Sequence, residues 1–134
     1  MTKYGRPDKA WDTLVEAGIE FLRERAALGR DTSYTEMSVT LARRTGLPPF
    51  DFSQPMERAA MGHLLGRIVE QTYPSVGAML SSLVIYLDAN DAGTGFYALA
   101  EQMGLLPRGA SKTAKERFWV GEVAKVFAHF GRAR

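Results

Sequence analysis

The sequence contains no cysteine, and only two of its 134 residues are histidine. The absence of cysteine excludes disulfide bonds, thiolate metal sites and a cysteine nucleophile. His63 and His129 are far apart in the sequence, and neither has a carboxylate or a second histidine four residues on. A metal site needs several such ligands at close spacing. We therefore expect no metal centre, no cofactor and no catalytic histidine.

The chain also lacks a long apolar segment. No stretch approaches the roughly 18 apolar residues that a membrane span requires. The N-terminal stretch MTKYGRPDKAW carries charges and lacks the apolar core of a secretion signal. We therefore expect a cytoplasmic protein with no membrane partner. With 46% hydrophobic residues the chain can fill one core, so we expect a single domain over residues 1–134.

Acidic residues are scarce in the last quarter of the chain. Residues 1–101 contain 10 Lys and Arg against 13 Asp and Glu, whereas residues 102–134 contain 7 against 2. A concentrated basic segment attracts polyanions such as nucleic acids through a long-range field. A solvated helix face of the same composition is the more ordinary interpretation.

Two helices are predicted in the first third of the chain. Residues 8–28 carry apolar side chains at helical spacing, with an acidic row on the other face, and Gly29 follows them. Ser33 and Glu36 have the S-x-x-E spacing of a capping box, which predicts the start of a second, short helix. Gly46 fits the position after the last turn of that helix.

The rest of the chain predicts three more helices and one strand. A third helix starts at Pro55, and we expect Pro74 to end it. Residues 79–87 are rich in apolar and β-branched side chains and predict a strand, and the Asp, Asn and Gly of residues 88–95 predict a turn. A short helix and a final helix over residues 112–130 follow. This order predicts a mainly α fold with a small β-sheet, an α+β class.

The segment DANDAGTGFYALA contains two partial matches to ligand-binding motifs. A G-x-G-x-x-A pattern starts at Gly93, but five residues separate it from the strand, and no second parallel strand with a terminal acid follows. A comparison with a calcium-binding EF-hand loop starts at Asp88, but Leu99 stands where the bidentate Glu belongs. We interpret the segment as turn chemistry.

The helix pair within residues 33–72 favours a helix-turn-helix. The second helix of such a pair enters the major groove of DNA, where its outward side chains meet phosphates and base edges. Glu57 and Glu70 on that helix repel phosphate. Arginines and a histidine of the helix pair, together with three residues of the basic segment, are the predicted nucleic-acid contacts: Arg43, Arg44, Arg58, His63, Arg67, Arg108, Lys112 and Lys115.

The same region carries a family resemblance. TSYTEMSVTLARRTGLP followed by RAAMGHLLGRI resembles the winged-helix DNA-binding domain of O6-alkylguanine alkyltransferases and alkyltransferase-like proteins, over residues 33–72. The resemblance implies a winged-helix core that binds DNA, and it makes Arg58 the arginine that fills the space of a flipped base. The family's Pro-Cys-His-Arg segment is absent, so alkyl transfer is excluded. The matching residues are Ser33, Tyr34, Gly46, Pro48, Arg58, Gly62 and Leu65.

These patterns together predict a non-enzymatic binding protein. We expect a winged-helix-like core flanked by extra N- and C-terminal helices, with a strand and turn over residues 83–95, and double-stranded DNA as the partner. The alternative is a protein-protein interaction module of a phage, mobile element or defence system, or a self-associating protein. The aromatic residues expected to be exposed favour this alternative. They are Tyr4, Phe50, Phe52 and Tyr73.

A third hypothesis is an enzyme. Its substrate pocket would lie around Tyr34, His63, Asp88 and Asp91. The sequence has no G-x-S-x-G nucleophile motif to support it.

Overall fold

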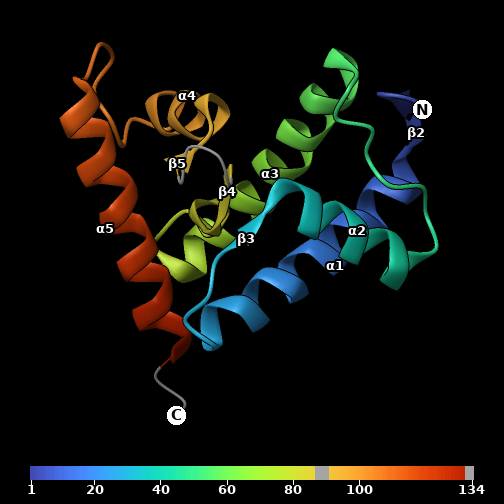
Figure 1. Ribbon diagram of the computed structural model, residues 1–134, viewed down its shortest axis with the longest axis horizontal. Helices are drawn as coiled ribbons and strands as arrows, with labels where there is room; N and C mark the ends of the chain where they lie inside the picture. Colours follow the sequence, from blue (N-terminus) through green and yellow to red (C-terminus); the bar gives the residue numbers. More distant parts are fainter. Residues whose placement is uncertain (87–90, 132–134) are drawn as a thin grey trace.

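The computed structural model describes residues 1–86 and 91–131, and its described part is mainly helical with two small sheets (Figure 1). The mainly α class with a small β-sheet is therefore confirmed. The winged-helix-like arrangement stays a prediction. The helical elements are α1 (Asp8–Ala27), α2 (Tyr34–Thr45), α3 (Pro55–Val76), the 3₁₀ turn η1 (Leu80–Leu83), α4 (Thr94–Gln102) and α5 (Lys112–Gly131).

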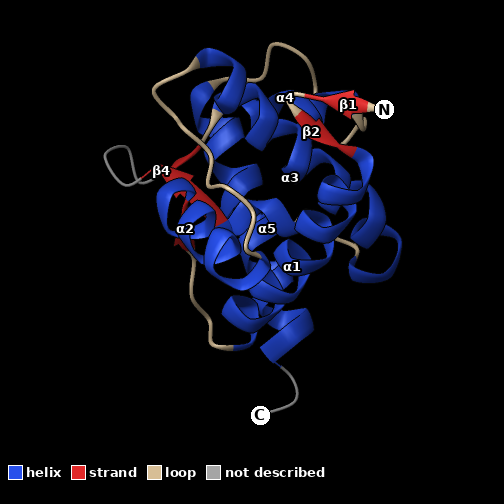
Figure 2. Cartoon of the chain, turned by 90° about the vertical axis from the view of Figure 1, so that its right-hand side faces the viewer, coloured by secondary structure: helices blue, strands red, loops and turns tan. Residues whose placement is uncertain are grey.

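The strands form two separate sheets, one beside the N-terminus (Figure 2) and the other beside the start of α4 (Figure 1). The first pairs β1 (Thr2–Lys3) with β2 (Arg6–Pro7) in antiparallel orientation. In the second, β4 (Val84–Tyr86) lies between β3 (Thr32–Ser33), which is parallel to it, and β5 (Asp91–Ala92), which is antiparallel. This second sheet ties the start of α2 to the segment that precedes α4.

The predicted ends of α2 are confirmed. The Ser33 hydroxyl accepts a hydrogen bond from the backbone N–H of Glu36 at 3.0 Å, which caps the first turn. Gly46 follows the last turn with φ 76°, a left-handed conformation that glycine adopts without strain. The Glu36 carboxylate accepts from the Thr32 hydroxyl and from Arg25, both at 2.6 Å, and these two bonds fix the start of α2 against α1.

The prediction that Pro74 ends the third helix is wrong. Pro74 lies inside α3, which continues to Val76 and ends at Gly77 with φ 73°. A proline in a helix removes one backbone donor and one intrahelical hydrogen bond. Here the loss falls in the last turn, and the N–H of Gly77 still donates to the Tyr73 carbonyl at 2.8 Å. The helix therefore tolerates Pro74 and stops where the backbone turns left-handed.

The prediction of a strand over residues 79–87 is also wrong for most of its length. Leu80–Leu83 form η1, and the strand is only Val84–Tyr86. Contacts from α5 account for the difference: the N–H of Met79 donates to the buried carboxylate of Glu122 at 3.0 Å, and Trp119 Nε1 donates to the Ser82 carbonyl at 2.9 Å. Of the turn predicted over residues 88–95, residues 88–90 lie outside the described residues, Asp91–Ala92 form a short strand, and Thr94 already begins α4.

The core forms around α1, which packs against α2, α3 and α5. Gly18 of α1 permits this packing, because a Cβ there would lie 2.7 Å from Ile68 Cδ1 of α3 and 3.4 Å from Met37 Cε of α2. Both α2 and α3 pack on α1, α3 packs equally on η1, and residues 46–54 connect α2 to α3. This connection is longer than the three- or four-residue turn of a helix-turn-helix.

The aromatic residues expected at the surface are largely covered, so that expectation is wrong. Phe50 is buried at 7% exposure and stacks on Phe52, with ring centroids 6.1 Å apart. Tyr4, Phe52 and Tyr73 are partly buried and pack against the core. In the connection between α2 and α3, the ring of Phe50 lies 6.4 Å from that of Trp11 of α1, and the ring of Phe52 lies 6.4 Å from that of Tyr34 of α2.

Within residues 1–86 and 91–131, no helix has the length and apolar character needed to cross a lipid bilayer.

Candidate nucleic-acid interface

A cavity of about 690 Å³, the α3–α4 groove, contains several of the predicted contact residues. Three small residues of α3, Ala59, Gly62 and Gly66, line one wall, and Gly95 and Ala98 of α4 line the other. A Cβ added at Gly62 or Gly66 would have no neighbour within 4 Å. The side of α3 that faces the groove therefore contains a strip without large side chains, which a large ligand can approach closely. The other α3 residues in the lining carry long or bulky side chains: Arg58, His63, Leu65, Arg67 and Glu70.

Arg58 and Arg67 both line the groove, although they are nine residues apart along α3. Arg58 is exposed, and its Nη1 donates to the Phe52 carbonyl at 2.7 Å. Arg67 donates from Nη2 to Asp12 at 3.0 Å, and its side chain is 36% exposed. A guanidinium has five N–H donors, so each of these arginines keeps several for a ligand.

Two tyrosines form the end of the groove beside the second sheet. Tyr34 of α2 and Tyr86 of β4 lie with ring centroids 4.5 Å apart. Gly93 makes this approach feasible, because a Cβ there would lie 2.5 Å from Tyr86 Cε2 and 3.0 Å from the Tyr34 hydroxyl oxygen. Tyr86 is 48% exposed and presents its ring to the solvent.

His63 lines the groove from its half-buried position on α3. Its ring lies edge-on to Trp11, with centroids 4.7 Å apart, and 5.7 Å from the ring of Tyr4. Burial lowers the pKa of His63 from its ordinary value of 6.5, and the charges of Lys3 and Arg67 lower it further. At neutral pH the imidazole is uncharged and adds no positive charge to the groove.

The structure does not bring Arg43 and Arg44 to the groove. Both lie at the C-terminal end of α2, and neither is among the residues that line the cavity. Arg44 forms two hydrogen bonds with the Glu24 carboxylate, at 2.8 and 3.0 Å. This pairing raises the pKa of Arg44 and lowers that of Glu24. The charge of Arg44 is thus compensated by Glu24 of α1, whereas the side chain of Arg43 is exposed to solvent.

The predicted contacts in the basic segment also lie outside the lining of the groove. Arg108 and Lys112 are exposed, in the loop before α5 and in its first turn. The ammonium of Lys115 lies 5.8 Å from the ring centroid of Tyr97, on the α5 side of α4. These residues contribute to the electrostatic field of the molecule without contacting the groove.

Several groove residues were missed by sequence reasoning. The wall formed by α4 was interpreted only as a helix after a turn, and Tyr86 only as part of a strand. Ser81 is also in the lining; it is 3% exposed, and its hydroxyl has no hydrogen-bond partner among the described residues. The available signal was the glycine pattern at Gly93 and Gly95, which marks close approach of the backbone to other groups.

The pocket of the enzyme hypothesis is only partly described. Tyr34 and His63 do line one cavity, the α3–α4 groove. Asp88 lies outside the described residues, as do the next two residues of the loop that the EF-hand comparison used. Among residues 1–86 and 91–131, no cluster of three His, Asp or Glu side chains is arranged to hold a metal ion.

Comparisons with known proteins identify no relative: no protein-family model, no curated protein and no solved structure matches the chain. The resemblance to the alkyltransferase DNA-binding domain therefore rests on the matching residues alone. Four of them converge on the groove, namely Tyr34, Arg58, Gly62 and Leu65.

Proposed function

We propose that this chain is a binding protein for double-stranded DNA and that the α3–α4 groove is its contact surface. The observation that carries the proposal is a bare strip of helix between two arginines: Ala59, Gly62 and Gly66 lie between Arg58 and Arg67. Phosphate contacts from arginine supply most of the sequence-independent affinity for DNA. A strip of helix that carries nothing larger than a methyl group lets the sugar-phosphate backbone come close enough for those contacts.

The energetics of the glycines support the proposal. Glycine inside a helix costs about 1 kcal/mol relative to alanine. At Gly62 and Gly66 no neighbouring atom explains that cost, because the space beside them is open. Gly121 of α5 also has open space, so a helical glycine alone marks no site. The difference is that Gly62 and Gly66 lie in a cavity between arginines.

The resemblance supports the proposal independently of the glycine argument. It makes Arg58 the arginine that fills the space of a flipped base, and it includes Tyr34 among the matching residues. Tyr34 and Arg58 come from different elements, α2 and α3, and both line the groove. Glu70 also lines the groove and repels phosphate, so we expect the DNA backbone to lie toward the end where Arg58 and Tyr34 are found.

The first experiment measures DNA affinity by fluorescence anisotropy at two salt concentrations. We expect the logarithm of affinity to fall steeply and linearly with the logarithm of salt concentration. Arg58→Ala should weaken binding about tenfold, within the range for loss of an arginine contact. Arg30→Ala, which removes an exposed arginine outside the groove, is the matched control. Absence of binding at low salt would rule the proposal out.

A second experiment separates binding from folding. Gly66→Ala should raise the free energy of unfolding by about 0.5–1 kcal/mol, because alanine is the better helix former. It should also weaken DNA binding, because the new methyl group projects into the groove. Gly121→Ala should stabilise the protein by a similar amount and leave binding unchanged. If both variants bind DNA equally well, the bare strip has no role in recognition.

A protein partner is the second candidate, and the exposure of Tyr86 favours it. This ring is 48% exposed beside a cavity with glycine walls, where the helix of a partner or a second copy could pack closely. Light scattering coupled to size exclusion tests self-association directly. A molar mass that stays at the monomer value up to high concentration would rule out the second copy.

A further inference from the structure

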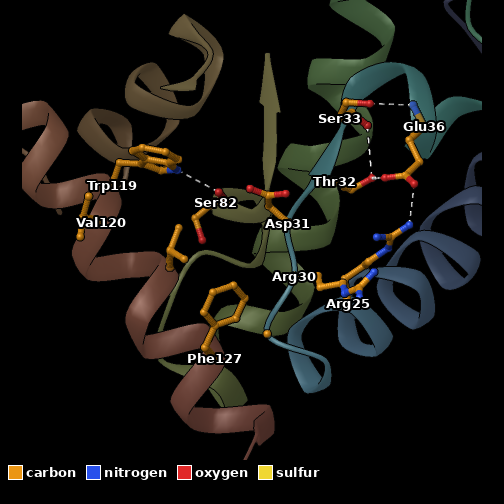
Figure 3. A pocket seen from close by; sticks show the side chains of 12 residues that line it. Arg25, Arg30, Asp31, Thr32, Ser33, Glu36, Ser82, Trp119, Val120 and Phe127 are labelled. Atoms are coloured by element: carbon orange, nitrogen blue, oxygen red, sulfur yellow. Dashed lines mark hydrogen bonds and ion pairs between the residues drawn. The ribbon is translucent and has the colours of Figure 1, made fainter. Parts of the chain in front are cut away.

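A second cavity, the α5 crevice, lies between α5 and the loop that joins α1 to α2 (Figure 3). Its volume is about 820 Å³, and it shares no lining residue with the α3–α4 groove. Trp119, Val123 and Phe127 of α5 form an apolar wall, and residues 29–33 form the wall opposite. The crevice thus has one apolar and one polar side, as small-molecule sites commonly do.

Ser82 lies between these walls. Ser82 is fully buried, with 0% of its surface exposed, and its hydroxyl has no hydrogen-bond partner among residues 1–86 and 91–131. The backbone carbonyl of Ser82 is already used, since it accepts from Trp119 Nε1 at 2.9 Å. Figure 3 shows the side chain directed into the crevice, away from that bond. Buried hydroxyls almost always have a partner, so this one is available to a ligand.

The charges on the polar wall are directed differently. Asp31 extends from the loop toward Ser82, whereas Arg30 extends toward α1 (Figure 3). Arg25, a residue of α1, extends toward Glu36 and away from α5. Arg25 is paired with Glu36 at 2.6 Å, so these two charges compensate each other. No hydrogen bond or ion pair engages Asp31 in the described part of the chain. The ionised group that faces the crevice is therefore a carboxylate.

We propose that the α5 crevice binds a small primary ammonium ion with an aromatic or aliphatic body. The ammonium has three N–H donors. One would donate to the Asp31 carboxylate and a second to the Ser82 hydroxyl, which accepts through its oxygen. The apolar body would lie against Val123 and Phe127, and the indole of Trp119 would add a cation–π attraction. This proposal does not depend on DNA binding.

The first test uses the two indole N–H groups as reporters. Proton–nitrogen correlation spectra of the full chain would be recorded during a titration with phenethylamine. The Trp119 indole signal should shift, whereas that of Trp11, which donates to the Lys3 carbonyl in the core, should stay in place as an internal control. Phenylpropionate, of similar shape and opposite charge, should produce no shift. If phenylpropionate shifts the Trp119 signal as strongly as the amine does, the proposed polarity is wrong.

The second test compares two buried serines. Ser82→Ala removes a hydroxyl that has no partner, so the Tm of the free protein should stay the same or rise, while amine binding weakens at least about tenfold. Ser81→Ala removes the other unpartnered buried hydroxyl, which lines the α3–α4 groove, and should leave amine binding unchanged. Equal effects of the two variants on amine binding would overturn the role of Ser82.

The third test concerns charge. Asp31→Asn should abolish the preference for phenethylamine over phenylpropionate. Arg43→Gln, which removes an exposed charge at the C-terminal end of α2 and outside the crevice, should leave amine binding unchanged. Neither side chain is buried, so both variants should fold. Retention of the preference in Asp31→Asn, or its loss in Arg43→Gln, would contradict the assignment of Asp31 as the ammonium partner.

Discussion

Arg6 and Glu57 form an ion pair in which both side chains are largely buried, at 13% and 14% exposure. The guanidinium makes two hydrogen bonds to the carboxylate, at 2.8 and 3.0 Å, and lies 4.3 Å from the ring centroid of Phe50. The hydrogen bonds from Arg6 lower the pKa of Glu57 despite its burial. The pair fastens the N-terminal sheet to the first turn of α3, next to Arg58.

Removing one partner of this pair should be costly. Arg6→Met leaves the Glu57 carboxylate buried without its cation, and we expect the free energy of unfolding to fall by about 3 kcal/mol. Arg44→Met breaks the exposed pair with Glu24 and should cost less than about 1 kcal/mol. Urea denaturation of both variants measures the difference. Equal losses would show that Glu57 is hydrated in the folded protein.

His63 should make stability depend on pH near neutrality. Its pKa in the folded protein is lowered from 6.5, chiefly by burial, so the unfolded chain binds more protons as the pH falls through 6.5. The free energy of unfolding should therefore be highest above pH 6.5 and should decline as the pH falls from 6.5 to the pKa of His63 in the folded protein. The pKa of Glu57 is lowered from 4.5, so this carboxylate remains charged in that window.

The measurement is the urea midpoint between about pH 8 and pH 5, a range that extends below the ordinary pKa of histidine. His63→Phe keeps a ring against Trp11 and removes the titrating group, so its curve should be flat over that range. His129→Phe, which replaces an exposed histidine, is the control and should keep the slope of the unchanged protein. A flat curve for the unchanged protein would mean that His63 is fully hydrated.

At the scale of elements, the close contact between α1 and α3 depends on Gly18, which has no side chain. Gly18→Ala places a Cβ 2.7 Å from Ile68 Cδ1, and overpacking of a core typically costs about 1–3 kcal/mol. The better helix propensity of alanine offsets up to about 1 kcal/mol of that loss. We therefore expect a net destabilisation of about 1 kcal/mol, measured by urea denaturation.

A double-mutant cycle tests the steric cause. Ile68→Val removes the Cδ1 methyl group, and in that background Gly18→Ala should become neutral or stabilising. The two substitutions should therefore deviate from additivity, as substitutions at contacting positions do. If Gly18→Ala costs the same in both backgrounds, the clash lies elsewhere in α1.

The helices were predictable because their ends are decided locally. Ser33 caps an amide three residues away, and Gly46 ends α2 through its own backbone conformation. The 3₁₀ turn η1 was not predictable, because Glu122 and Trp119 of α5 determine it from about 40 residues away in sequence. Local propensity favoured a strand there, and tertiary contacts overrode it.

The residues of the candidate site also fall into those that local sequence predicts and those that depend on tertiary contacts. Arg58 and Arg67 were predicted as outward residues of one helix, and both do line the groove. The pairing of Arg44 with Glu24 was not predictable, because it depends on how α2 crosses α1. The contribution of α4 was also missed, because the position of a helix after a turn depends on the strand pairing that precedes it.

Across the whole molecule, the excess of basic residues and the proposed DNA contact lie on different elements. The basic residues of residues 102–134 belong to the loop before α5, to α5 and to the C-terminal end, and none of those described lines the α3–α4 groove. Charges that do not touch a ligand act through their field, which solvent ions screen over about 10 Å at 0.1 M salt. Such charges accelerate association more than they slow dissociation.

This separation gives a kinetic prediction. Replacement of Lys112 and Arg117, both exposed on α5, by glutamine should lower the association rate with duplex DNA at low salt and leave the dissociation rate unchanged. Arg58→Ala should instead raise the dissociation rate, because it removes a direct contact. Stopped-flow anisotropy resolves both rates. A rise in the dissociation rate of the α5 variant as large as that of Arg58→Ala would mean that α5 itself contacts DNA and that the interface extends across α4.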